Sequence, residues 1–245
     1  MPWQILVSAR EDKVASMQIL PTITSITPSG AWRDKVKEVK RLKLKDVALF
    51  PTCLEPDERK ELYQLLKETN VKSIPFVHLR NDMAIEELDY LVQNYQTKIF
   101  NTHTQREFPF LYDYAKYKNV IYIENVYEPL DEEEIKEFAG VCLDISHLET
   151  DRILNLAQYE HNIKIIDKYG CGCSHLSALK KEPFRDIKNV LRYDSHHLEN
   201  LSELDYLKRY PLKYFSHLVA VELENTIEEQ LKVIKYLKKK ILKRR

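Results

Sequence analysis

The 245-residue sequence contains only four glycines, and none of them belongs to a Gly-x-Gly-x-x-Gly motif or a phosphate-binding loop. Open nucleotide-binding sheets depend on such glycines because their backbone must approach the phosphates closely. Their absence disfavours an open, doubly wound sheet that binds a dinucleotide. A different α/β architecture is therefore expected wherever strands and helices alternate.

A net charge and a long apolar segment are also missing. The 38 basic residues equal the 38 acidic ones, so no overall field attracts a polynucleotide; this lowers the expectation of a nucleic-acid partner without excluding it. No run of 18 apolar residues occurs, and the Met1-Pro-Trp start lacks the regions of a signal peptide. We expect a soluble, cytoplasmic protein with no membrane partner.

Cysteine is scarce as well, with Cys53, Cys142, Cys171 and Cys173 as the complete set. Three of the four lie in strand-like sequence, which favours reduced thiols over a disulfide framework. The pair Cys171-Gly-Cys173 lacks the spacing of a zinc ribbon or a redox Cys-x-x-Cys motif. Its simplest interpretation is two small residues on a packed strand.

Strand and helix patterns alternate along most of the chain. After a short strand-like stretch at 3–8, the predicted barrel strands are residues 17–26, 46–50, 73–79, 98–101, 120–125, 140–147, 171–177 and 219–223. Helical patterns lie between them, including 85–95, 108–118 and 149–169, and an irregular basic connection from residue 178 leads to a helix at 201–210. The pattern predicts an α/β fold of the (β/α)8 TIM barrel type, a single domain over 1–245 with an N-terminal extension at 1–16 and the barrel at 17–242.

Polar side chains recur where the predicted strands end. Active sites of such barrels form at the carboxyl ends of the strands, because the loops there meet at one mouth. Imidazoles and carboxylates are ligands for zinc, manganese and iron. The side chains at or just after these strand ends are His78, His103, Glu124, Asp144, His147, His175, Asp194, His196 and Glu222 or Glu224, with Glu222 preferred. Their regular placement predicts a metal site.

The segment Gly140-Val-Cys-Leu-Asp-Ile-Ser-His147 resembles the sixth-strand motif of the xylose isomerase-like barrels. This superfamily includes endonuclease IV, or AP endonuclease family 2, and the sugar phosphate isomerases and epimerases. The segments His175-Leu-Ser and Asp194-Ser-His196 are similar to motifs of the seventh strand and of the loop after it. The resemblance extends from about residue 17 to 242 and implies a TIM barrel.

The resemblance to endonuclease IV also implies a multinuclear zinc site with nine ligands. The implied set is His78, His103, Glu124, Asp144, His147, His175, Asp194, His196 and Glu222. A sugar epimerase of the same superfamily would hold one ion, with manganese as an alternative to zinc, through Glu124, Asp144, His175 and Glu222, and would use His147 for substrate. Departures concern the substrate-binding parts: Ala178 replaces an expected acid, and no glycine follows Asp194-Ser-His196.

Three functions remain open at this stage. The first is metal-dependent phosphoester hydrolysis, in which Glu124 orients the nucleophile and Lys180, Lys181 or Arg192 contacts a phosphate. The second is isomerisation or epimerisation of a sugar or sugar phosphate, in which Glu124 and Glu222 transfer protons on opposite faces. The third is a metal-binding barrel without catalysis. The expected partner is a small phosphorylated or sugar-containing substrate, and the sequence does not indicate an oligomeric state.

Overall fold

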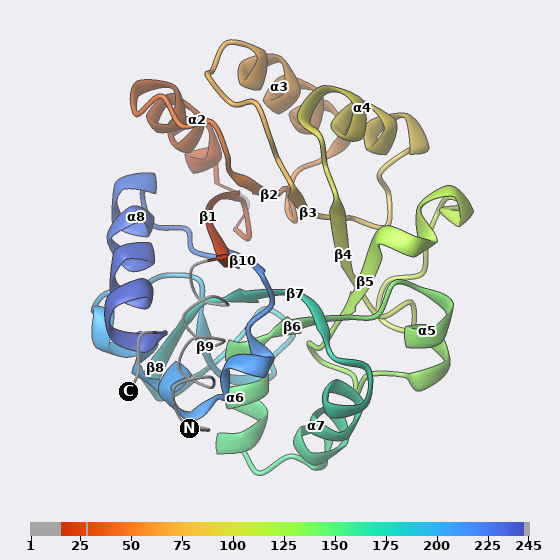
Figure 1. Cartoon of the computed structure of the whole chain (residues 1–245), viewed down its shortest axis with the longest axis vertical. Coiled ribbons are helices and arrows are strands. Elements are labelled where there is room, and N and C mark those ends of the chain that lie inside the picture. The colour runs from red at the N-terminus through yellow and green to blue at the C-terminus, as the bar shows by residue number, and fades with distance from the viewer. Residues whose placement is uncertain (1–15, 28, 243–245) are drawn as a thin grey trace, which may run out of the picture.

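A computed structural model describes residues 16–27 and 29–242, in which eight parallel strands close into a barrel (Figure 1). The order around the barrel is β1-β10-β7-β6-β5-β4-β3-β2. Each barrel strand therefore pairs with the barrel strands before and after it along the chain, and β1 pairs with β10 to close the barrel. The strands are β1 (Gln18–Thr24), β2 (Ala48–Phe50), β3 (Phe76–His78), β4 (Ile99–His103), β5 (Ile121–Glu124), β6 (Val141–Asp144), β7 (Cys171–Leu176) and β10 (Leu218–Val221). The predicted single-domain (β/α)8 barrel is confirmed; the strand predicted at 3–8 lies outside the described residues.

Helices surround these strands on the outside of the barrel (Figure 1). They are α2 (Ala31–Arg41), α3 (Pro56–Lys67), α4 (Ile85–Tyr95), α5 (Glu132–Glu137), α6 (Ile145–Ile153), α7 (Ala157–Tyr169) and α8 (Ile227–Tyr236), which continues as η4 (Leu237–Ile241). Local sequence explains their starts. At α8, for example, the Thr226 hydroxyl accepts a hydrogen bond from the Glu229 N–H, and the Glu229 carboxylate accepts one from the Thr226 N–H. Their apolar faces bury the main core against the strands.

The helix predicted at 108–118 is wrong. Only a short 3-10 helix, η1 (Ala115–Val120), forms between β4 and β5. Pro109 lacks the N–H that a helix interior needs. The Asp113 carboxylate accepts a hydrogen bond from the Ala115 N–H, and this local turn precedes the 3-10 helix that begins at Ala115. Tyr114 nevertheless packs into the core, and its hydroxyl donates a hydrogen bond to the Met83 carbonyl.

The predicted long helix at 149–169 is two helices, and it starts earlier than expected. Helix α6 begins at Ile145, directly after β6, and ends at Ile153; helix α7 follows from Ala157. Asn155 between them adopts a φ of 54°, in the left-handed region that stops a right-handed helix. The early start of α6 matters for the site, because it places His147 on the first turn of a helix.

The connection after β7 contains a β-hairpin where an irregular segment was predicted. Strand β8 (Ala178–Arg185) pairs antiparallel with β9 (Leu191–Ser195), and 3-10 helices η2 (Leu201–Arg209) and η3 (Leu212–Tyr214) follow. At the hairpin tip the Asp186 carboxylate accepts hydrogen bonds from the N–H groups of Lys188 and Val190. Strand β9 packs against α6, which positions Asp194 beside the barrel mouth.

Alternate residues of each strand point into the barrel and fill it below the mouth. Small and apolar side chains such as Leu20, Ala48 and Phe76 form this floor. The Tyr122 ring lies directly over Gly172: a Cβ there would sit 2.0 Å from the ring, so only glycine fits. The next inward layer toward the carboxyl ends is polar, and most of its side chains are buried.

Candidate metal centre

The polar layer at the carboxyl ends of six strands converges at the barrel mouth. The register places neighbouring inward residues side by side: His103 is the partner of Glu124, and Asp144 is the partner of His175. Glu124 is 2% exposed, and His175 and Asp144 are fully buried. A buried carboxylate or imidazole must be paired or bind an ion, because removing an isolated charge from water is unfavourable.

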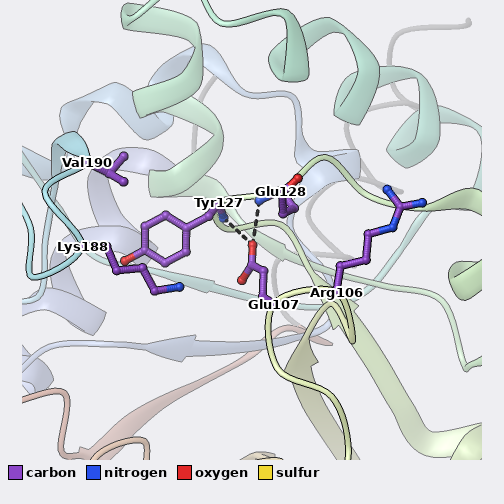
Figure 2. A pocket seen from close by; sticks show the side chains of 6 residues that line it. All are labelled: Arg106, Glu107, Tyr127, Glu128, Lys188 and Val190. Carbon is purple, nitrogen blue, oxygen red and sulfur yellow. Dashed lines mark hydrogen bonds between the residues drawn. The ribbon is translucent and has the colours of Figure 1, made fainter.

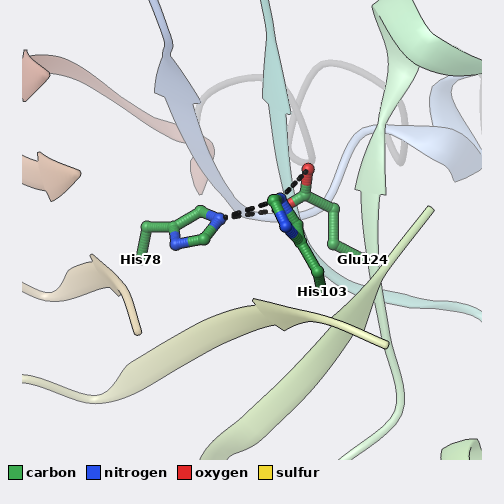
Figure 3. Close-up of side chains that lie close together, drawn as sticks. All are labelled: His78, His103 and Glu124. Carbon is green, nitrogen blue, oxygen red and sulfur yellow. Dashed lines mark hydrogen bonds and ion pairs between the residues drawn. The ribbon is translucent and has the colours of Figure 1, made fainter. Parts of the chain in front are cut away.

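The first group of side chains combines His78, His103 and Glu124 (Figure 3). The two Nε2 atoms lie 3.3 Å apart, and they lie 3.4 and 3.7 Å from the Glu124 carboxylate oxygens. Two ligand atoms each about 2.1 Å from a tetrahedral zinc ion are about 3.4 Å apart. The three side chains therefore have the spacing of ligands to a single ion.

The second group combines Asp144, His175 and Glu222. His175 Nδ1 lies 3.2 Å from Asp144 Oδ2 and 2.8 Å from Glu222 Oε2, while its Nε2 lies 3.1 Å from Glu124 Oε2. Both His175 nitrogens and Asp144 Oδ2 are buried without a hydrogen bond among the described residues. Such atoms are rare in proteins unless a water molecule or an ion satisfies them, so this donor set fits a divalent cation.

Asp144 has two separate roles because α6 begins immediately after β6. Its Oδ1 accepts hydrogen bonds from the N–H groups of Ser146 and His147 and so caps the helix. Its Oδ2 remains free and points toward the cluster, 3.4 Å from His147 Nε2. The spacing Asp-x-x-His thus brings both side chains to the mouth, with Glu124, Asp144 and His147 as a third group of possible ligands.

His147 is held from behind by the hairpin. Asp194 Oδ2 lies 3.0 Å from His147 Nδ1, and Asp194 Oδ1 accepts hydrogen bonds from Thr150 and Arg192. A carboxylate on one ring nitrogen leaves the other nitrogen free to face an ion, an arrangement common at metal-binding histidines. Arg192 also contacts His147 Nδ1, and it is buried in the same network.

Four further candidate residues lie outside the groups of possible ligands. His196 Nε2 lies 3.7 Å from Glu222 Oε2, and the His196 side chain is 23% exposed. Lys180 forms ion pairs with Glu199 and Glu203, at 3.0 and 3.2 Å, and Lys181 is exposed on β8. Glu224 Oε1 accepts hydrogen bonds from the N–H groups of Ile26 and Thr27 in the loop after β1, whereas Glu222 belongs to the second group.

Two further residues contact the cluster, although the sequence pattern did not distinguish them as candidates. Cys142 offers a sulfur atom within 4.8 Å of the donor atoms of Glu124 and His175. Asn101 donates a hydrogen bond from its amide to Glu124 Oε2. Each lies two residues before a predicted ligand on the same strand, so the period of two along a strand was the available signal.

Four buried carboxylates, those of Glu124, Asp144, Asp194 and Glu222, lie in or beside the cluster. Burial alone would raise the pKa of Glu124, but His175 and His103 hold that pKa well below its ordinary value. Burial likewise opposes the protonated form of His147, yet Asp144 and Asp194 raise its pKa to about 9. Burial lowers the pKa of His103 to about 3. Nearby histidines likewise hold the pKa values of Asp144 and Glu222 below their ordinary values against the effect of burial, so the carboxylates of the cluster stay ionised, as ligands to a cation must be.

Neither a protein-family model nor a curated protein matches the sequence. Among solved structures, the chain is similar to a conserved protein of unknown function from a locus in Enterococcus faecalis, at 12% identity and a TM-score of 0.48 over 91% of this chain and 66% of that chain. It is also similar to N-acetylneuraminate lyase from Mycoplasma synoviae, at 13% identity and a TM-score of 0.44 over 92% of this chain and 75% of that chain. A third similar structure is AP endonuclease, family 2, from Brucella melitensis, at 8% identity and a TM-score of 0.40 over 88% of this chain and 96% of that chain.

The chain spans slightly less than two thirds of the length of the Enterococcus protein. At these identities and TM-scores the three similarities carry no information on activity. Among the described residues, no helix is both long and apolar enough to cross a membrane.

Proposed function

We propose that the chain is a divalent-metal-dependent enzyme that hydrolyses phosphoesters at the mouth of a xylose isomerase-like barrel, as endonuclease IV-like enzymes do. One observation carries the proposal: Glu124 is shared between the His78–His103 group and the groups that contain Asp144, His147 and His175. A carboxylate shared between donor sets is suited to bridge two ions. The site would then hold more than one ion, with zinc as the first candidate and manganese as the second.

Bound ions would polarise a phosphoryl oxygen and make a water molecule more acidic. The side chains of the protein orient the reacting groups. Glu124 orients the attacking water, and the Asn101 amide fixes the Glu124 carboxylate through a hydrogen bond. Arg192 and Asp194 hold the His147 ring in place. We assign catalytic roles to Glu124, Glu222 and His147. Of the three predicted phosphate contacts, Arg192 holds His147 and Lys180 pairs with Glu199 and Glu203, which leaves the exposed Lys181 for that role.

A second candidate function is isomerisation or epimerisation of a sugar or sugar phosphate. It is favoured by the burial of one particular group: Asp144, His175 and Glu222 are at most 4% exposed, whereas the side chains of His103 and His196 are 22% and 23% exposed. One ion in this deep group, with Glu124 beside it, would suffice for such a reaction. Glu124 and Glu222 would then transfer the protons.

Metal analysis together with two assays separates these functions. The purified protein is loaded with zinc or manganese in chelator-free buffer, its bound metal is measured by mass spectrometry, and it is assayed with bis(p-nitrophenyl) phosphate and with a panel of aldose and ketose phosphates. We expect at least two ions per chain and phosphodiester hydrolysis. One ion with isomerase activity would favour the alternative, and fewer than one ion per chain would exclude both.

Glu222→Gln and Glu224→Gln form a matched pair on the same strand end. Because Glu222 Oε2 lies 2.8 Å from His175 Nδ1, Glu222→Gln should weaken binding of one ion by about 10–100-fold. Glu224→Gln keeps an oxygen for the backbone N–H groups of Ile26 and Thr27 and should leave metal affinity unchanged. The measurement is zinc titration against a competing chelator. The assignment of Glu222 is wrong if both variants bind zinc like the wild type.

Metal affinity should rise with pH up to about 9. Since Asp144 and Asp194 raise the pKa of His147 to about 9, a proton must leave before an ion binds its Nε2. The apparent zinc Kd should therefore fall about tenfold per pH unit between pH 6.5 and 9 for each proton displaced. A chelator competition series over this range measures the slope, and a Kd that does not change with pH would contradict this role of His147.

The metal-free protein should respond to pH in the opposite direction. The folded-state pKa of His147 exceeds its unfolded value, so its contribution to stability is fully present below about pH 6.5 and is lost as the pH rises through about 9. Urea unfolding of the metal-free protein across this window should show a falling unfolding free energy. A rising one would show that another group dominates.

A further inference from the structure

A pocket of about 560 Å³ opens at the barrel mouth, and Figure 2 shows the side chains that line it. It lies among the loop after β4, the loop after β5 and the tip of the β8–β9 hairpin, and its lining residues are Arg106, Glu107, Tyr127, Glu128, Lys188 and Val190. Pockets for small ligands commonly have volumes of about 300–1,000 Å³. The volume therefore suits a small organic molecule in addition to a phosphate group.

Two aromatic residues connect this pocket to the metal cluster. The Phe108 ring lies 5.2 Å from the His103 ring, and the Arg192 guanidinium lies 5.2 Å from the Tyr127 ring. His103 and the Arg192 partner His147 both belong to the candidate ligand groups. The pocket therefore adjoins the cluster, with Phe108 and Arg192 between the two.

Glu107 carries an unused hydrogen-bond acceptor in this pocket. Its Oε1 accepts hydrogen bonds from the N–H groups of Tyr127 and Glu128, at 3.0 and 2.7 Å, which fixes the carboxylate in place. Its Oε2 is buried and has no hydrogen-bond partner among the described residues. An acceptor withdrawn from water without a donor is unfavourable, so a ligand that brings a donor to Oε2 gains binding free energy.

Lys188 supplies the complementary donor. Its Nζ lies 4.0 Å from the centre of the Tyr127 ring and 4.6 Å from that of Phe108. In the part of the chain that the structure describes, Lys188 takes part in no ion pair. The Tyr127 hydroxyl donates to Asp186 Oδ2 at 2.8 Å, which ties the hairpin tip to the loop after β5 and keeps Lys188 at the pocket.

We infer that this pocket binds the sugar part of a phosphorylated sugar whose phosphoester lies at the metal centre, and that Glu107 is a specificity-determining residue. The inference rests on the proposed function. A sugar hydroxyl both donates and accepts hydrogen bonds, so it can donate to Glu107 Oε2 and accept from Lys188. An uncharged apolar group would leave Glu107 unpaired.

Calorimetric binding to the zinc-loaded protein tests the inference. The probes are ribose 5-phosphate, glucose 6-phosphate and glycerol 3-phosphate, with ethyl phosphate as a phosphate ester that has no hydroxyl group. For the wild type, at least one sugar phosphate should bind about tenfold more tightly than ethyl phosphate. Glu107→Gln keeps an oxygen for the two backbone N–H groups and should remove this preference while leaving ethyl phosphate affinity unchanged.

Glu160→Gln is the matched control, because it removes the same charge from an exposed position on α7. It should bind all four probes like the wild type. Equal affinities of all probes in the wild type, or a preference that persists in Glu107→Gln, would overturn the sugar pocket and leave the metal-dependent phosphate site standing. If zinc-loaded and zinc-free protein both fail to bind any phosphate, the proposed function fails with it.

Discussion

Replacing Glu124 by glutamine should remove at least one bound ion per chain and lower phosphodiester hydrolysis by about 10³-fold, the equivalent of about 4 kcal/mol in the barrier. Glu124 faces four histidines: its carboxylate oxygens lie 3.4 Å from His78 Nε2, 3.7 Å from His103 Nε2, 3.1 Å from His175 Nε2 and 3.9 Å from His147 Nε2. Glutamine has the same shape but carries no charge, and its amide nitrogen cannot bind a cation. The loss should therefore affect all three groups of possible ligands that contain Glu124.

Bound metal, measured by mass spectrometry, and the rate with bis(p-nitrophenyl) phosphate check this prediction. Glu134→Gln serves as the control because Glu134 is also partly buried and accepts a hydrogen bond from the Gln105 N–H, yet lies outside the cluster. Circular dichroism should show that both variants fold. Wild-type metal content and rate in Glu124→Gln would refute the shared role of this carboxylate, whereas loss of one ion with an unchanged rate would limit its role to metal binding.

Removing the metal should lower the melting temperature by about 10 °C. A ligand at about 1,000 times its Kd stabilises the folded state by about 4 kcal/mol, and about 1 kcal/mol shifts the melting temperature of a chain of this size by roughly 2–4 °C. The physical cause is the burial of three carboxylates, those of Glu124, Asp144 and Glu222. Asp144 Oδ2 and both ring nitrogens of His175 have no hydrogen-bond partner among the described residues. A cation neutralises their mutual repulsion.

Calorimetry at one scan rate, on zinc-loaded protein and on protein stripped with a chelator and dialysed, measures this shift. The double variant Glu124→Gln/Glu222→Gln is the control, because it keeps the side-chain shapes and removes two of the three carboxylates. Its melting temperature should change little with zinc. Equal melting temperatures for the loaded and stripped wild type would mean that the cluster holds no tightly bound ion.

The barrel was predictable because its determinants are local and repeat along the chain. Apolar runs such as 141–143 read as strands without any knowledge of their neighbours, and eight of them in alternation with helical patterns leave few arrangements other than a closed parallel sheet. Prediction failed where tertiary contacts or single residues overruled the pattern. The segment 108–118 has helical periodicity, but Pro109 and the Asp113 turn prevent an α-helix.

The hairpin after β7 was not predicted because its strands, β8 and β9, pair only with each other and carry polar residues on both faces. The consequence for the site is direct. Arg192 was selected as a phosphate contact, and the hairpin instead places it against Asp194 and His147. Lys188, which the sequence did not distinguish from its basic neighbours, is the lysine that reaches the pocket.

The sequence by itself determined the barrel and the identity of most polar residues at its mouth. The reason is that position within a strand decides which side chains point inward and which strand end they share. Only the tertiary structure decided their partners. It placed Asp144 as both helix cap and cluster member, separated Glu222 from Glu224, added Cys142 and Asn101, and set Glu107 beside Lys188. These relations depend on distances between atoms far apart in the chain, which residue spacing alone cannot supply.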